Sequence, residues 1–222
     1  MNHADTTLIG PWQTRLRAAA ERSLKGTPLT RSDATTDERR AFVDAFSDEL
    51  GNRARVVTPF LAAAAGLSPS GTRSGTLDLD DRLWWAVHDP ESPVADFGSG
   101  VGPLDPTLGE IAIESRTETE LSAMHALFRL GLDRGEPGMI GRALDAARWQ
   151  VAELQPDNGT NHPWGIHVFV VLAARSDDPG ESGAALMHAQ MLLHNCQVQM
   201  GRPDRLSACI LWDAAVTLGR IR

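Results

Sequence analysis

The spacing of apolar residues along the chain predicts helices through most of its length. In the N-terminal third, three helices are expected, at about 11–25, 36–50 and 59–65. Pro11 stands at the first position of the first helix, where proline is favoured. Thr35 and Glu38 have the spacing of a capping box for the second helix, and Gly66 fits the end of the third. Residues 1–66 therefore form a helical N-terminal region in this interpretation.

The middle of the chain, residues 67–115, has a different pattern. Residues 67–81 and 89–110 are rich in Gly, Pro, Ser and Asp, and they surround one apolar island at 83–87. Loops of this length are uncommon inside a compact domain, and we expect these two segments to be the least ordered parts of the chain. Residues 110–114 alternate between polar and apolar side chains, which predicts one short strand.

From Thr117 onward the helical pattern returns. Helices are expected at 117–132 and 138–154, from Pro163, at 182–199, and from Asp204 to near the end. Thr117 and Glu120 again have capping-box spacing. Residues 164–174 are apolar on every side, so the helix that contains them should be the most buried one.

These C-terminal helices also repeat. When residues 125–157 are placed on residues 167–199, a shift of 42 without gaps, nine of the 33 pairs are identical. Average composition would give roughly two or three identities. A period near 40 is typical of stacked helix-pair repeats. The valine-rich segment 166–172 is therefore predicted to be helical, like its partner segment 124–130.

The pattern as a whole predicts an all-α protein of stacked antiparallel helix hairpins, a partial or open α/α toroid. The expected organisation is an N-terminal helical region at 1–66, a loop-rich connector at 67–115 and the hairpin repeats at 116–222, together forming one compact domain.

One acidic motif carries a family resemblance. Asp78, Asp80 and Asp81 form an Asp-x-Asp-Asp sequence just before the island at 83–87. This resembles the acid motif of class II terpene cyclases, whose α/α-toroid fold is shared with protein prenyltransferases. The resemblance implies that the middle aspartate, Asp80, protonates a substrate. The alternative is an acidic loop that caps a helix at 82–88.

Composition narrows the range of partners. The net charge of −8 argues against a general nucleic-acid or anionic-membrane surface. Two cysteines are too few for a disulfide scaffold. The N-terminus lacks the basic start and apolar core of a signal peptide, and the longest apolar run, 164–174, is too short for a bilayer span. We therefore expect a cytoplasmic protein that binds neither nucleic acid nor membrane.

Two groups of polar residues are candidates for a ligand site. His125, His167 and Cys209 occupy equivalent positions in the repeat, so their side chains are expected to face one another along the stack. With ordinary pKa values near 6.5, the imidazoles would exchange protons at neutral pH. The alternative is a stack of core histidines bonded to nearby backbone.

The second group lies in the loop 155–164, which precedes the most buried helix. It contains a carboxylate, two amides, an imidazole and an indole: Asp157, Asn158, Asn161, His162 and Trp164. Backbone N–H groups at a helix start suit a polar or anionic ligand. The alternative is a rigid connector built on the Asn158-Gly159 turn.

These groups predict a small-molecule-binding pocket lined by the histidines and the 155–164 loop, with enzymatic activity left open. The alternative function is a non-catalytic scaffold that binds a protein partner. No His or Cys pair has zinc-site spacing, so no metal site is predicted, and the sequence identifies no cofactor.

Overall fold

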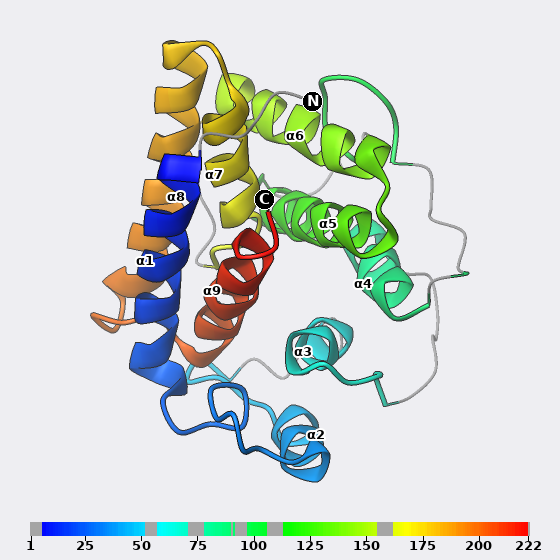
Figure 1. Cartoon of the computed structure of the whole chain (residues 1–222), viewed down its shortest axis with the longest axis vertical. Helices are drawn as coiled ribbons and strands as arrows, with labels where there is room; N and C mark the ends of the chain where they lie inside the picture. The colour runs from blue at the N-terminus through cyan, green and yellow to red at the C-terminus, as the bar shows by residue number, and fades with distance from the viewer. Residues whose placement is uncertain are drawn as a thin grey trace.

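The computed structural model describes residues 6–51, 57–70, 78–89, 91, 97–105, 113–154 and 162–221. Within these ranges the chain forms nine α-helices and no strand, so the predicted all-α class is confirmed (Figure 1). The helices are α1 Thr6–Leu24, α2 Thr36–Asp44, α3 Val57–Ala65, α4 Leu79–His88, α5 Ile113–Arg134, α6 Pro137–Glu153, α7 Ile166–Arg175, α8 Pro179–Val198 and α9 Arg205–Leu218.

The first helix begins earlier than predicted, and Pro11 lies inside it. The buried face of α1 starts at Ile9 and continues through Trp12 and Leu16, which is the spacing of one helix stripe. Because the core-facing stripe begins before the proline, packing extends the helix past the position that propensity favours as its start.

The second helix confirms its predicted start but not its predicted end. Glu38 donates its backbone N–H to the Thr35 hydroxyl at 3.2 Å, and Thr35 donates its own to the Glu38 carboxylate at 2.7 Å. The helix ends at Asp44 instead of reaching residue 50. After the helix, buried Asp48 accepts the N–H of Leu50 at 3.0 Å in a non-helical turn.

The fifth helix overturns two predictions. It begins at Ile113, so Thr117 and Glu120 lie in its interior and form no capping box. Glu120 instead accepts the backbone N–H groups of Leu104 and Asp105, which come from a distant loop. Residues 113 and 114 are helical, so the predicted strand at 110–114 is wrong there, and its residues 110–112 lie outside the described ranges.

The seventh helix confirms the predicted burial: every residue from Ile166 to Ala174 is buried. It begins three residues after Pro163, because Gly165 has a left-handed backbone with φ of 67°. A Cβ atom at Gly165 would lie 2.5 Å from Met124 Cε and 3.2 Å from the Leu121 carbonyl oxygen. Only glycine allows α5 to approach the start of α7 this closely.

Sequence neighbours pack as antiparallel pairs, α5 with α6 and α7 with α8. α1 packs on α9 and α7, and Arg15 of α1 donates to Gln190 of α8 at 2.9 Å (Figure 1). The N-terminal region thus lies directly on the C-terminal hairpins. The first helices of the two hairpins have 22 and 10 residues, so the period-42 repeat and a toroid-like stacking stay predictions.

The segments predicted as loops, 67–81 and 89–110, are described only in part, because residues 71–77, 90, 92–96 and 106–112 lie outside the described ranges. Residues 79–81 belong to α4 instead of a loop. Residues 97–105 lie against α6, where Arg142 donates to the carbonyl oxygens of Phe97, Gly102 and Pro103. No helix in the described part of the chain combines the length and apolarity needed to cross a membrane.

Candidate functional site

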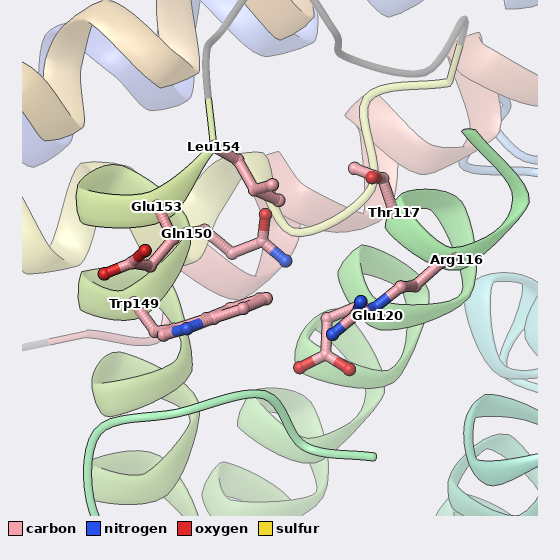
Figure 2. Close-up of a pocket in the computed structure, with 7 residues that line it drawn as sticks. All are labelled: Arg116, Thr117, Glu120, Trp149, Gln150, Glu153 and Leu154. Carbon is pink, nitrogen blue, oxygen red and sulfur yellow. The ribbon is translucent and has the colours of Figure 1, made fainter. Parts of the chain in front are cut away.

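A cavity of about 160 Å³ lies between the start of α5 and the end of α6 (Figure 2). One water molecule needs roughly 15 Å³ by the same measure, so the cavity has room for several waters or a small molecule. Its lining residues are Arg116, Thr117 and Glu120 from α5 and Trp149, Gln150, Glu153 and Leu154 from the end of α6.

Gln150 is the unusual residue of this lining. Its side chain is 2% exposed, and its Nε2 group has no hydrogen-bond partner among the described residues. Figure 2 shows its amide pointing into the space between the two helices, with Leu154 above it and the Trp149 ring below. A buried N–H donor without a partner costs roughly 1–3 kcal/mol. A hydrogen-bond acceptor placed in the cavity would satisfy this group.

The charged groups around the cavity differ in the interactions that they already make within the protein. Burial raises the pKa of Glu120, although the N–H groups of Leu104 and Asp105 oppose this effect. The Arg116 guanidinium lies over the Trp149 ring, 5.8 Å from its centroid, and Glu153 is exposed at the rim. The cavity thus offers an aromatic face, one unsatisfied N–H donor and a cation beside that face.

His125 and His167, two of the three residues expected to face one another, lie side by side. Their ring centroids lie 4.2 Å apart, and both side chains are fully buried. Aromatic rings from four different segments surround the pair: Phe60, Trp84, Phe128 and Trp164. The histidines are therefore part of the central core, and they do not line the α5–α6 cavity.

The hydrogen bonds of His125 define its state. Its Nδ1 atom accepts the N–H of Gly165 at 3.3 Å, so Nε2 carries the proton and donates to Asp213 at 3.1 Å. Asp213 in turn forms an ion pair with Arg129. α9 thus contributes Asp213 to this network, one helical turn beyond the predicted Cys209. Cys209 is also fully buried, and burial raises the pKa of its thiol.

His167 has no hydrogen-bond partner on either ring nitrogen among the described residues. Burial, followed by the charge of Arg129, lowers the pKa of His125 well below its ordinary value. Burial also lowers the pKa of His167, with smaller effects of His125 and Arg129. The expectation of imidazoles that titrate near 6.5 is therefore wrong, because water cannot solvate their charged forms in the core.

The acidic motif lies in the first turn of α4 instead of in a loop before it. Asp78 is the N-cap residue, but its side chain makes no capping bond. Asp80 is buried, and burial raises its pKa to about 7, although a hydrogen bond from Ser122 opposes this. Ser122 also accepts the indole N–H of Trp84 at 3.1 Å. Asp80 is therefore a buried carboxyl tied to the aromatic core through Ser122.

The predicted 155–164 loop is described only at its end. Asp157, Asn158 and Asn161 lie outside the described residues, so their role stays a prediction. Trp164 packs in the core, 4.7 Å from Phe60 between ring centroids. His162 Nδ1 lies 2.5 Å from the Glu118 carboxylate. Burial lowers the pKa of His162, but Glu118, Asp204 and Asp48 together raise it above its ordinary value.

Sequence reasoning missed the lining residues Arg116, Trp149 and Gln150. One signal was present, because Gln150 stands four residues before Leu154 and three after Ala147, on the apolar stripe of its helix. A polar residue at a core position often marks an internal hydrogen bond or a ligand contact.

Comparison with protein-family models, with curated proteins and with solved structures finds no match for this chain. No family is therefore assigned, and the resemblance of the acidic motif to terpene cyclases gains no support from these comparisons. The functional proposal rests on the geometry of the cavity and its lining.

Proposed function

We propose that this protein binds a small, flat, uncharged molecule in the cavity between α5 and α6. The observation that carries the proposal is the buried Nε2 group of Gln150, which faces a cavity and has no partner among the described residues. Small-molecule sites typically combine an apolar wall with a few polar groups that fix orientation. Here Trp149 and Leu154 form the wall, and Gln150 is the orienting group.

The lining favours a ring that carries a carbonyl oxygen. The carbonyl would accept the N–H of Gln150, while the ring would lie against the indole of Trp149. Arg116 already occupies one side of that indole, so a cationic ligand would meet a like charge there. An anionic ligand would lie beside Glu120 and Glu153, which also line the cavity. An uncharged ligand avoids both penalties.

The buried histidines support binding more than catalysis at this site. A general base must reach the proton that it removes, and His125 and His167 are sealed in the aromatic core. The predicted pocket lined by histidines is thus replaced, in this proposal, by the cavity beside Leu154 at the end of α6.

The scaffold alternative requires an exposed apolar patch of several hundred Å². The large exposed apolar side chains of the described residues are few: Leu50, Val101, Met187, Val198, Met200 and Val216. Met187 and Val198 both lie on α8, about 16 Å apart along its axis. Because such single side chains are normal on protein surfaces, they favour the cavity over the scaffold.

The test measures binding of three compounds that share one ring: benzamide, benzoate and benzylamine. Ligand-observed NMR and tryptophan fluorescence should detect binding of benzamide to the wild-type protein. They should detect little binding of benzoate or benzylamine, which are charged. Gln150→Met has a similar volume and removes the amide, so it should weaken benzamide binding about tenfold, the value of one hydrogen bond of about 1.4 kcal/mol.

Gln199→Met is the matched control, because Gln199 is exposed and does not line the cavity. This variant should bind benzamide as the wild type does. Equal binding of all three compounds, or equal binding by Gln150→Met, would contradict the proposal. A buried water would then be the simplest partner for Gln150.

A further inference from the structure

A second group of polar residues lies away from the cavity, where three distant segments of the chain meet. Asp48 follows α2, His162 precedes the turn into α7, and Asp204 is the N-cap residue of α9. One potential ligand atom from each residue lies within 4.8 Å of the other two. All three residues are at most 9% exposed. The group is thus a buried set of two carboxylates and an imidazole.

The carboxylates of this group carry a net negative charge into the protein interior. Burying two such groups side by side costs free energy unless a cation or several hydrogen bonds compensate them. The nearest arginines along the chain are engaged elsewhere. Arg202 donates to Glu49 and Ser23, and Arg205 donates to the carbonyl oxygen of Ser47. The two carboxylates therefore favour a positive charge at this point, either a proton on His162 or a metal ion bound in its place.

The imidazole is held as histidine ligands of metals are commonly held. His162 Nδ1 lies 2.5 Å from the carboxylate of Glu118, a residue of α5 that is not itself in the group. In the neutral ring that donates its Nδ1 proton to Glu118, the lone pair lies on Nε2 and is free to bind a metal ion in place of a proton. A carboxylate bonded to the outer nitrogen of a metal-binding histidine orients the ring and strengthens the ligand.

The bonds made by Asp204 leave room for this role. Its Oδ1 atom accepts the N–H of Ser207 at 2.9 Å, and its Oδ2 atom accepts the Ser207 hydroxyl at 2.5 Å. Each carboxylate oxygen has two lone pairs, so capping α9 does not exhaust either oxygen.

We propose that Asp48, His162 and Asp204 bind a divalent transition-metal ion, with Zn²⁺ as the best fit to one nitrogen and two carboxylate ligands. Zinc accepts both ligand types at about 2.0–2.2 Å. The bound ion joins the segment after α2, the turn before α7 and the start of α9. Sequence spacing cannot show this site, because its residues stand 114 and 42 positions apart.

The test uses the full-length chain, treated with EDTA and then freed of chelator. Calorimetric titration with ZnCl₂ should show one saturable site per chain, and the thermal midpoint should rise with zinc concentration. Asp48→Asn and Asp204→Asn should abolish binding. Both variants keep the shape of the side chain, and asparagine at position 204 still caps α9. Glu118→Gln should weaken zinc binding 10- to 100-fold.

Two controls separate this site from adventitious binding. Asp178→Asn changes the charge of another N-cap residue, that of α8, and His194→Gln removes an exposed imidazole. Both should keep wild-type affinity. No saturable zinc binding by the wild type, or wild-type affinity in both aspartate variants, would overturn the proposal. Binding of Mg²⁺ or Ca²⁺ as tight as that of Zn²⁺ would overturn the choice of metal. If circular dichroism shows that an aspartate variant does not fold, the zinc affinity of Glu118→Gln becomes the deciding measurement.

Discussion

The buried carboxyl of Asp80 makes the stability of the fold depend on pH in a direction that can be calculated. Its pKa rises from 3.8 to about 7 because burial disfavours the charged form. Between these values the folded state holds a proton that the unfolded chain releases. Stability is therefore lost as the pH rises from about 4 to 7, and the loss is complete above 7. Each pKa unit is worth 1.36 kcal/mol, so ionised Asp80 costs the folded state about 4 kcal/mol.

Asp80→Asn keeps the shape of the side chain and removes this cost. The stability of the variant relative to the wild type should rise by about 3 kcal/mol between pH 5 and pH 8. Over the two pH units from 5 to 7 the folded wild type holds a proton that its unfolded chain has released, and each unit is worth about 1.36 kcal/mol. Urea denaturation followed by tryptophan fluorescence at pH 5.0, 6.5 and 8.0 measures this difference. Any constant effect of the new amide on the bond to Ser122 cancels when the two pH values are compared.

Asp78→Asn is the matched control, because it makes the same charge change at an exposed position two residues earlier. Its effect on stability should depend much less on pH. A difference between Asp80→Asn and the wild type that stays constant from pH 5 to pH 8, or that grows toward low pH, would refute the reasoning.

Two further substitutions test the core, and a third serves as a control on the surface of α8. His167→Met replaces a neutral buried imidazole whose pKa is lowered well below its ordinary value. The unfolded wild-type chain therefore takes up a proton below about pH 6.5 that the folded protein does not, and the wild type loses stability there. In the same urea assay the variant should lose less stability, by up to about 1.36 kcal/mol for each pH unit. An equal loss in both proteins would contradict the lowered pKa. Gly165 has a positive φ and lies against α5, so Gly165→Ala should destabilise the folded protein by about 2–4 kcal/mol in thermal unfolding. Gly183 lies in an open helical position, so Gly183→Ala should stabilise the folded protein by about 0.5–1 kcal/mol. Similar effects of the two substitutions would show that the approach is not tight.

Local patterns in the sequence determined the class of the fold and much of its segmentation. Apolar periodicity identified the helical regions, including α7, whose continuous apolar run correctly predicted burial on all sides. The capping box at Thr35 was also correct, because its two hydrogen bonds span only three residues. The same pattern at Thr117 failed, since Glu120 bonds a loop that no local rule brings near it.

The candidate site was predicted less well. The shift of 42 led us to expect that His125 and His167 face each other, and their ring centroids lie 4.2 Å apart, although the repeat itself stays a prediction. It did not indicate that Asp213 replaces Cys209 in the network, since a difference of one turn depends on how far α9 slides along its neighbours. The cavity beside Gln150 and the Asp48–His162–Asp204 group likewise arise from contacts between segments far apart in the chain.

Which features the sequence predicts depends on how far apart along the chain the interacting residues lie. Hydrogen bonds and apolar stripes within a helix repeat every few residues, so the sequence alone reports them. Burial raises the pKa of Asp80 and lowers that of His167, and burial is a property of everything packed around a residue. Only the tertiary structure decides which polar groups are removed from water and which of them face one another.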